Sequence, residues 1–377
     1  MTDNWKTYTL GEVLEIKYGK DHKLLSDGDI PVYGSGGIMR YANKALYDQP
    51  TILIPRKGTL SNLFFIEHPF WSVDTMFYTK IREGNNPKFI YYYLKTLNLA
   101  ALNVGSAVPS LTTEVLNKVE IQLPSIDFQN QIVTILSSLD YKIELNNQMN
   151  QTLEAMAQAI FKEWFVDFKF PGFDGELVDG LPKGWRLGNL TDLVETVSKT
   201  FKFSEHQNVI FLNTSDILDG EFLNSTLVPS KGLPGQAKKT ILKGDILFSE
   251  IRPANKRYAY VNFDSEDYVV STKLMVLRSK GIFDNIITYY ILKSSDVLKE
   301  LQSLAESRSG TFPQITYTEL SKISVNIPTE EVIDKFTVIL QNVNEKMSRN
   351  VIEIRTLTDL RDSLLPKLMN GKIKTNQ

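Results

Sequence analysis

The sequence PSLTTEVLNKVEIQLP at residues 109–124 recurs without a gap as PQITYTELSKISVNIP at residues 313–328. Other positions exchange one apolar residue for another, as Leu111 does for Ile315. The identical positions are Pro109/Pro313, Thr112/Thr316, Leu116/Leu320, Lys118/Lys322 and Pro124/Pro328. A match of this length within one chain predicts that one structural unit has been duplicated.

The duplication extends upstream in a looser form. Trp5, followed by Leu10-Gly11, has a counterpart in Trp185, followed by Leu187-Gly188. Each copy is far longer than the unit of a solenoid and long enough to form its own core. We therefore predict two globular domains, at residues 1–124 and 185–328, with loop insertions in the second copy. A duplicated chain suits a target that has two separate halves.

A long amphipathic pattern follows each domain. Residues 125–168 contain neither Gly nor Pro, and the second pattern covers residues 329–370. Apolar positions recur in alternating steps of four and three, as in coiled coils, and polar residues interrupt both seams at matching places. The expected seam is Phe128/Val332, Ile132/Phe336, Ile135/Ile339, Leu139/Val343, Lys142/Lys346, Asn146/Asn350, Met149/Glu353, Leu153/Leu357, Met156/Leu360 and Ile160/Leu364. The Gly- and Pro-rich linker at residues 169–184 favours antiparallel packing of the two helices.

Within each domain, short β-rich runs alternate with turn signals and precede a helix. The predicted strands are 30–33, 51–54 and 64–66 in the first domain and 245–248, 258–261 and 269–272 in the second, with helices at 88–95 and 286–293. We expect Tyr91, Tyr92 and Tyr93 to face the core of the first domain. The predicted fold class is α+β or mixed α/β, with two globular domains joined by two long antiparallel coiled-coil helices as a pseudo-two-fold internal repeat.

Composition excludes several classes of protein. The chain has 377 residues, no cysteine and three histidines, so neither a disulfide framework nor a histidine or thiolate metal site is expected. A formal net charge of −2 argues against coating nucleic acid by bulk charge, but it permits site-specific binding. The sequence shows neither a signal segment nor a long apolar run, so we expect a cytoplasmic protein without membrane contact.

Motifs for catalysis are incomplete. Neither Gly19-Lys20 nor Gly371-Lys372 completes a phosphate-binding loop, and the turn at residues 34–37 is a weak phosphate signal because no suitable helix follows it. Asp127 with residues 140–142 has a nuclease-like spacing but falls on a predicted helix, which favours a structural role. We predict a non-catalytic protein that binds and positions.

The order of domain, long helix, domain, long helix resembles the specificity subunit (HsdS) of type I restriction-modification systems over essentially the whole chain. The segments that carry the resemblance are residues 28–38, 55–58, 69–75, 129–132 and 160–168, together with the Leu-Pro or Ile-Pro that closes each domain. The second domain lacks a close match to the Pro-Val-Tyr-Gly-Ser-Gly-Gly of residues 31–37. Such divergence is expected where two domains recognise different DNA.

The resemblance implies that each domain recognises one half of a bipartite, asymmetric double-stranded DNA target. It also implies that the paired helices set the gap and dock two modification (HsdM) subunits, which methylate adenine, while restriction (HsdR) subunits cleave. No cofactor is expected on this chain, since S-adenosylmethionine, ATP and Mg²⁺ would belong to the partner subunits. The alternatives are a coiled-coil interaction scaffold that does not read DNA and a stand-alone enzyme.

Candidate DNA-binding residues are polar or cationic side chains on predicted loops, because these side chains can reach base edges and phosphates. In the first domain they are Ser35, Arg40, Tyr41, Arg56, Lys57, Ser61, Asn62, Ser106 and Ser110. In the second they are Arg252, Asn255, Lys256, Arg257, Lys273, Ser307, Arg308, Ser309, Thr311 and Gln314, of which Arg308 is the favoured base contact.

Four large aromatic residues end the first helical pattern. Phe161, Trp164, Phe165 and Phe168 exceed what a narrow seam needs, although seam closure is the alternative. We predict that they form a docking patch for the modification subunit.

Overall fold

The computed structural model describes residues 5–105, 108–282 and 284–372. Contacts divide the chain into unit 1, Met1–Asn146 with Ile352–Gln377, and unit 2, Asn147–Val351. Each unit therefore contains one domain and one half of each long helix, α4 (Ile126–Phe165) and α9 (Glu330–Met369). Within the described ranges, none of the helices is long and apolar enough to cross a membrane.

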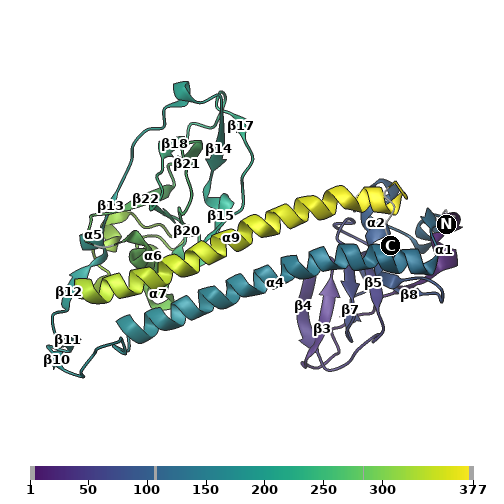
Figure 1. Cartoon of the computed structure of the whole chain (residues 1–377), viewed down its shortest axis with the longest axis horizontal. Helices are drawn as coiled ribbons and strands as arrows, with labels where there is room; N and C mark the ends of the chain where they lie inside the picture. Colours follow the sequence, from purple (N-terminus) through teal and green to yellow (C-terminus); the bar gives the residue numbers. More distant parts are fainter. Residues whose placement is uncertain (1–4, 106–107, 283, 373–377) are drawn as a thin grey trace. The chain divides into compact units, whose positions relative to one another are not determined.

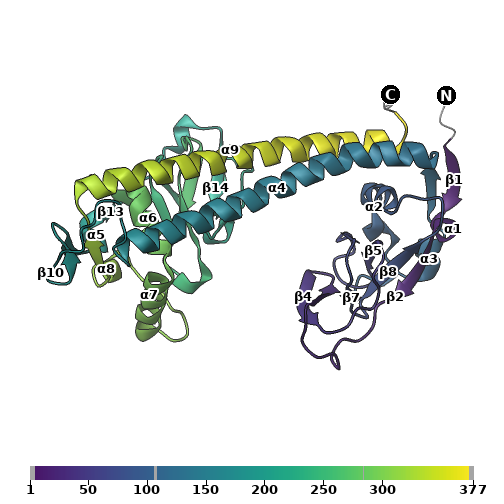
Figure 2. The same ribbon diagram turned by 60° about the horizontal axis from the view of Figure 1, so that its bottom comes forward.

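In unit 1, the repeated segment supplies strand β9, which pairs antiparallel with β1. A four-stranded sheet has the order β2-β8-β5-β6, and a three-stranded sheet has the order β4-β3-β7. Helix α2 (Pro87–Thr96) lies between α4 and strand β5 (Figure 2), and its N-cap Asn86 accepts hydrogen bonds from two backbone amides. The bounds are β1 Lys6–Thr9, α1 Leu10–Val13, β2 Leu14–Tyr18, β3 Ile30–Gly34, β4 Gly37–Ala42, β5 Thr51–Pro55, β6 Phe64–Ile66, β7 Trp71–Ser72, β8 Met76–Ile81, α3 Thr113–Asn117 and β9 Glu120–Leu123.

Unit 2 repeats this plan with an insertion. β12 pairs with β23 as β1 pairs with β9, and the sheet β13-β22-β19-β20 lies beside helix α6 (Figure 1). The sheet β17-β14-β21-β18 matches β4-β3-β7 of unit 1, because β14 pairs antiparallel with β17 and parallel with β21 as β3 does with β4 and β7. The additional strands β15, β16 and β18 lie between β14 and β19, where this copy is longer. The bounds are β12 Arg186–Asn189, α5 Leu190–Leu193, β13 Val194–Thr196, β14 Asn208–Leu212, β15 Ile217–Leu218, β16 Glu221–Phe222, β17 Val228–Pro229, β18 Ala237–Thr240, β19 Ile246–Ser249, β20 Tyr258–Tyr260, β21 Tyr268–Ser271, β22 Leu274–Ser279, α6 Asn285–Lys293, α7 Ser295–Arg308, α8 Tyr317–Leu320 and β23 Ser324–Ile327, with β10 Leu177–Val178 and β11 Leu181–Pro182 in the linker.

The long helices pair antiparallel within each unit. In unit 1, Phe128 near the start of α4 and Leu368 near the end of α9 share one core. In unit 2, Asn350 Nδ2 donates to Asn150 Oδ1 at 2.7 Å, and the end of α4 packs on Phe336 near the start of α9. The prediction of two antiparallel helices is confirmed.

The seam itself departs from the strict heptad prediction. Met156 is 53% exposed and Leu360 is 44% exposed, whereas Ala157 is fully buried. A straight α-helix has 3.6 residues per turn, so its buried face drifts away from a repeat of 3.5 over many turns. Helix α4 also ends at Phe165, three residues before the predicted end, and Phe168 follows in a left-handed conformation with φ 57°.

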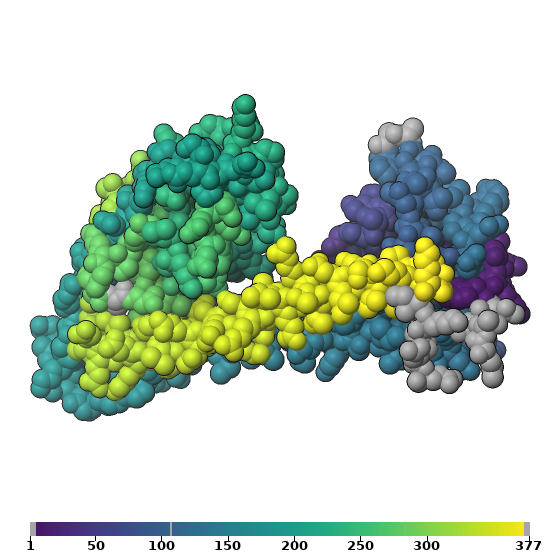
Figure 3. All heavy atoms as spheres, turned by 45° about the horizontal axis from the view of Figure 1, so that its top comes forward, coloured from purple at the N-terminus to yellow at the C-terminus, as the bar shows by residue number. Residues whose placement is uncertain are grey.

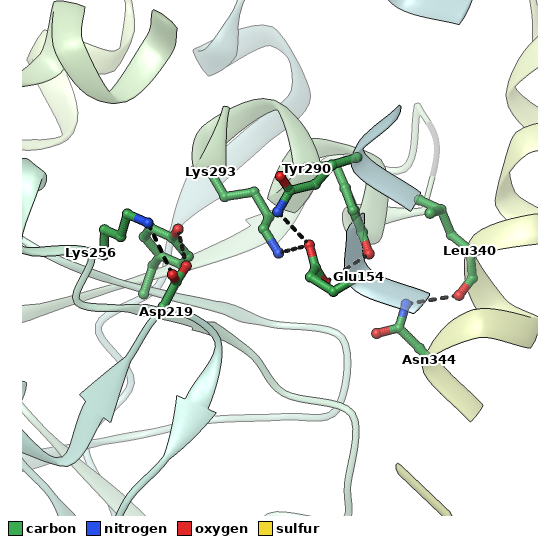
Figure 4. Close-up of polar contacts among 9 residues, drawn as sticks. Glu154, Asp219, Lys256, Tyr290, Lys293, Leu340 and Asn344 are labelled. Atoms are coloured by element: carbon green, nitrogen blue, oxygen red, sulfur yellow. Dashed lines mark hydrogen bonds and ion pairs between the residues drawn. The ribbon is translucent and has the colours of Figure 1, made fainter. Parts of the chain in front are cut away.

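A buried tyrosine attaches each domain to the long helices. In unit 1, the Tyr92 hydroxyl on α2 donates to Asp140 of α4, and Arg361 of α9 donates to the same carboxylate at 2.8 Å. In unit 2, the Tyr290 hydroxyl on α6 donates to Glu154 of α4, and Lys293 forms an ion pair with that carboxylate (Figure 4). We call these clusters the tyrosine anchors. Burial, followed by the nearby carboxylate, raises the pKa of Tyr92 and of Tyr290.

Candidate nucleic-acid interface

In unit 1, the loop after β5 is joined to the loop that precedes the repeated segment. Leu111 N donates to Arg56 O at 2.9 Å, and Gly58 N donates to Pro109 O at 3.2 Å. An isolated β-bridge connects Lys57 and Ser110 between these two hydrogen bonds. Three of the predicted contact residues, Arg56, Lys57 and Ser110, therefore lie together.

Unit 2 builds the same junction from different side chains. Ile315 N donates to Glu250 O at 2.8 Å, Arg252 N donates to Pro313 O at 3.1 Å, and an isolated bridge connects Ile251 with Gln314. We call residues 56–58 with 109–111, and residues 250–252 with 313–315, the paired loops of units 1 and 2. They bring the predicted contacts Arg252 and Gln314 together.

The paired loops align the two domains residue by residue. Arg56 corresponds to Glu250, Lys57 to Ile251, and Gly58 to Arg252, because each member makes the same backbone contact to the repeated segment. The backbone scaffold is thus repeated while the charges differ. Sequence comparison missed this correspondence, although Gly58 and Arg252 each lie three residues beyond the end of a matching strand.

The remaining candidates of unit 1 fall into two groups. Asn62 Nδ2 donates to Ser35 O at 3.0 Å, which joins the loop after β5 to the turn between β3 and β4, and Ser61 beside it is exposed. Strand β4 carries Tyr41, which is 52% exposed, and Arg40, whose Nη2 donates to Asp27 at 2.7 Å. Ser106 lies outside the described residues.

The candidates of unit 2 cluster around a turn at residues 253–255. Ala254 N donates to Gln302 Oε1 of α7 at 3.1 Å, and α7 ends at Arg308. Lys273 is exposed, and its carbonyl accepts from Glu250 N at 3.1 Å. The turn therefore lies beside the paired loop, and Asn255 in it and Thr311 in the following loop are exposed.

Several cations of unit 2 already hold intramolecular partners. Lys256 Nζ lies 3.0 Å from Asp219 Oδ2 (Figure 4), and Arg257 Nη1 donates to the carbonyl oxygens of Ser215 and Ile217. The Ser307 hydroxyl donates to Leu304 O, and the Ser309 hydroxyl accepts from Phe312 N. These contacts shape the loops and leave fewer side chains for DNA than the sequence predicted.

Arg308, the favoured base contact, is also engaged. Its Nη1 donates to Glu319 Oε2 at 2.7 Å, and the same carboxylate accepts from the backbone and hydroxyl of Thr316. Burial acts to raise the pKa of Glu319, but the Thr316 hydrogen bonds and the charge of Arg308 together lower it. The arginine thus helps to hold the start of α8, so the preference for Arg308 over Arg252 does not follow from the geometry.

The predicted aromatic docking patch requires a correction. Phe161, Trp164 and Phe165 are 8%, 7% and 5% exposed, and they pack on Phe336 and Trp185 inside unit 2. Phe168 also packs on Trp185. The large apolar side chains that suggested docking are instead buried against the second domain, on which the end of α4 packs.

The arrangement offers recognition chemistry. Among the described side chains, His, Asp and Glu do not gather into a group that could hold a metal ion. Asp140, from the nuclease-like spacing, is bonded to Tyr92 and Arg361. The paired loops, by contrast, present Lys57 and Arg252 near hydrogen-bonding side chains, and Lys273 lies beside the loop of unit 2. A surface that binds nucleic acid requires cations and hydrogen-bonding groups of this kind. Fold and site together define a two-domain binding protein.

The family model described as the type I restriction modification DNA specificity domain matches residues 2–155 and 182–353. The chain therefore belongs to this family, whose members are non-catalytic DNA-recognition subunits. The two matched ranges confirm the internal repeat.

Individual proteins similar to this chain are also specificity subunits of type I restriction enzymes. The HindI specificity subunit of Haemophilus influenzae is 41% identical over 184 residues, a match that spans 48% of this chain and 39% of that subunit. The MjaIX specificity subunit of Methanocaldococcus jannaschii is 25% identical over 347 residues, covering 88% of this chain and 79% of that subunit. The crystal structure of the type I S subunit from M. genitalium superposes with a TM-score of 0.66 at 16% identity, covering 97% and 96% of the two chains, and it shares the fold.

Proposed function

We infer that this chain selects a bipartite DNA sequence, with each unit recognising one half through its paired loops. The observation that carries the proposal is that one backbone junction occurs in both units with different side chains on it. A common scaffold with exchanged contact residues is the arrangement expected of two modules that dock on DNA alike but recognise different bases.

The long helices would set the number of unread base pairs between the halves. Helix α4 is a single helix of 40 residues that contributes to both units. An insertion of one turn in α4, with a matching turn in α9, lengthens each helix by about 6 Å. Because DNA rises about 3.4 Å per base pair, we expect the spacer to grow by one or two base pairs while both half-sequences stay the same.

The chain would act together with modification subunits. Two HsdM subunits, which would carry S-adenosylmethionine and methylate adenine, would dock on the paired helices, and HsdR subunits would cleave with ATP and Mg²⁺. After the correction of the aromatic patch, the docking candidate is the exposed surface of α9, which Figure 3 shows in yellow. In unit 2 this helix carries two exposed apolar side chains, Val338 and Val351, each 58% exposed.

Methylome sequencing of cells with and without the gene tests the proposal. We expect one bipartite motif to lose methylation when the gene is removed, and the paired insertion in α4 and α9 to change its spacer alone. A pure scaffold predicts no change in any methylated motif. A change of half-sequence on insertion would refute the spacer role.

A further inference from the structure

Arg252 occupies a backbone conformation that is unfavourable for its residue type. Its φ is 46° and its ψ is 77°, in the left-handed region, and Pro253 follows it. An L-residue with a long side chain rarely adopts this region, and a following proline restricts the preceding residue further towards extended conformations. The chain therefore holds Arg252 in a strained state.

Unit 1 has a glycine, Gly58, at the position that Arg252 occupies in unit 2, and its backbone is not strained there. Gly58, the counterpart of Arg252 in the paired loop, has φ 89°, and its amide makes the same hydrogen bond to the proline that begins the repeated segment. Glycine adopts positive φ without steric cost. A glycine would thus serve the backbone of unit 2 as well, so the arginine is not explained by the fold.

The guanidinium of Arg252 is free to contact a ligand. The residue is exposed, and in the part of the chain that the structure describes its side chain has no recorded hydrogen-bond or ion-pair partner. Of the other cations proposed for this region, Lys256, Arg257 and Arg308 have intramolecular partners, whereas Lys273 is exposed like Arg252. Among the arginines that the sequence proposed for unit 2, Arg252 alone is exposed and unengaged within the described ranges.

Hydrogen bonds also hold the backbone of Arg252 in place. The Arg252 amide donates to Pro313 O, its carbonyl accepts from Asn255 N at 2.8 Å, and Pro253 beside it is buried. Strain that the surrounding structure maintains is found at functional sites, where it fixes a group in advance of binding. A fixed arginine presents a planar fork of donors, which matches the O6 and N7 acceptors of guanine.

The geometry points to Arg252 as a specificity-determining residue of unit 2, which binds the guanine of a G·C pair in the half-site of that unit. The inference rests on the proposed function, since it assigns one contact within the DNA interface proposed above. Gly58 places no side chain at the corresponding point of unit 1, so the first half-site lacks this contact.

The test compares Arg252→Gly with Arg252→Lys in the chromosomal gene, with the methylated motif and the thermal unfolding of the purified full-length chain as readouts. We expect Arg252→Gly to unfold at a temperature roughly 2 °C higher, because strain is released. The G·C preference at one position of one half-site should fall by about 10-fold or more, since a bidentate base contact is removed. The other half-site should be unchanged.

Arg252→Lys separates base recognition from phosphate binding. It keeps the charge and the strained backbone but loses the fork of donors, so we expect the same relaxation of the G·C position without the rise in unfolding temperature. G·C preference retained in both Arg252→Lys and Arg252→Gly would assign Arg252 to a phosphate and overturn the inference. Lys322→Ala, which removes an exposed charge outside the paired loops, is the matched control and should leave the motif intact.

The failures of the two ideas are distinguishable. If the wild-type gene directs no methylated motif, the proposed function fails. If the wild-type motif exists and Arg252→Gly leaves it unchanged, only the assignment of Arg252 fails. An unfolding temperature of Arg252→Gly below that of the wild type would contradict the strain on which the assignment depends. Loss of the motif with an equal or higher unfolding temperature supports the assignment.

Discussion

The tyrosine anchors of the two units use one tyrosine position but different charged partners. Tyr92 and Tyr290 hold matching places in α2 and α6, and each donates to a carboxylate of α4. By the register of the repeat, Asp140 corresponds to Asn344, which lacks a charge and donates to Leu340 O instead (Figure 4). In unit 2 the carboxylate comes from Glu154, near the other end of α4, and the cation comes from Lys293 of α6 itself.

The repeat thus preserves the geometry of the contact but not the residues that make it. A buried hydroxyl needs a partner, and either long helix can supply the carboxylate because both run past each domain. The consequence differs between units. Arg361 ties α9 into the anchor of unit 1, whereas in unit 2 the α9 helix is held by the aromatic cluster around Phe336.

The cation of the unit 2 anchor is the more deeply buried of the two, since the Lys293 side chain is 3% exposed and that of Arg361 in unit 1 is 17% exposed. Lys293→Met leaves Glu154 without its cation in a site where the lysine side chain is 3% exposed, and we expect a loss of about 3 kcal/mol in the free energy of unfolding. Urea denaturation measures it. In the triple variant Lys293→Met, Glu154→Met and Tyr290→Phe, most of the loss should be recovered, because neither an unpaired charge nor the buried hydroxyl that Glu154 accepts from then remains. No recovery would mean that the ion pair itself stabilises the fold.

The tyrosine hydroxyls offer a matched pair. Tyr92→Phe and Tyr290→Phe each remove one hydrogen bond to a carboxylate, and we expect each to cost about 1.5 kcal/mol in urea denaturation. Asp140 keeps Arg361, and Glu154 keeps Lys293, so the two losses should be similar. A loss in only one variant would show that the anchors are not equivalent.

The start of the short helix in the repeated segment differs as well. Thr316 and Glu319 form a reciprocal capping box in unit 2, whereas Val115 replaces the glutamate in unit 1. Glutamine can keep the capping geometry but loses the charge that pairs with Arg308, so we expect Glu319→Gln to cost about 1 kcal/mol at pH 7. Because the folded-state pKa of Glu319 is lowered, its stabilisation is present above the unfolded pKa and disappears as the pH falls through the folded pKa.

Thermal unfolding of wild type and Glu319→Gln from pH 7 to pH 3 measures this dependence. The curves should converge at the acidic end, and Val115→Ala should show a difference that does not vary with pH. A constant gap for Glu319→Gln would indicate that the charge of the carboxylate contributes nothing.

The smallest effect concerns the matched seam asparagines. Asn146 and Asn350 are 1% and 0% exposed, and the Oδ1 of each lacks a partner among the described residues. Replacing Asn350 by Leu should raise the free energy of unfolding by up to about 1 kcal/mol, because an unsatisfied buried group is removed. If asparagine fixes the helix register, disulfide trapping of cysteine pairs across the helices should give a broader set of products in Asn350→Leu. A single product would limit the residue to a packing role.

Sequence patterns predicted the architecture well and the contacts poorly. The repeat at residues 109–124 and 313–328 predicted that the chain has two domains. The strands predicted at 51–54 and 245–248 are observed within one residue of those bounds, because alternating hydrophobicity and turn residues are local signals. The partner of Arg308 could not be predicted, since Glu319 reaches it only through the fold.

The aromatic residues at the end of α4 show the same limit. Their hydrophobicity predicted burial against a partner, but a sequence cannot say whether that partner is another chain or the second domain of the same chain. Trp185 and Phe336, both distant in sequence, decide it.

Unit 1 is assembled from two separate stretches of chain, and this has a consequence for synthesis. Leu365, Leu368 and Met369 belong to the same hydrophobic core as Leu10 and Phe89. A ribosome delivers those three residues long after the domain that they complete, so that domain cannot close its core until residue 369 has been synthesised. A stop codon directly after Val351 would therefore leave the core of unit 1 open and keep every residue of unit 2.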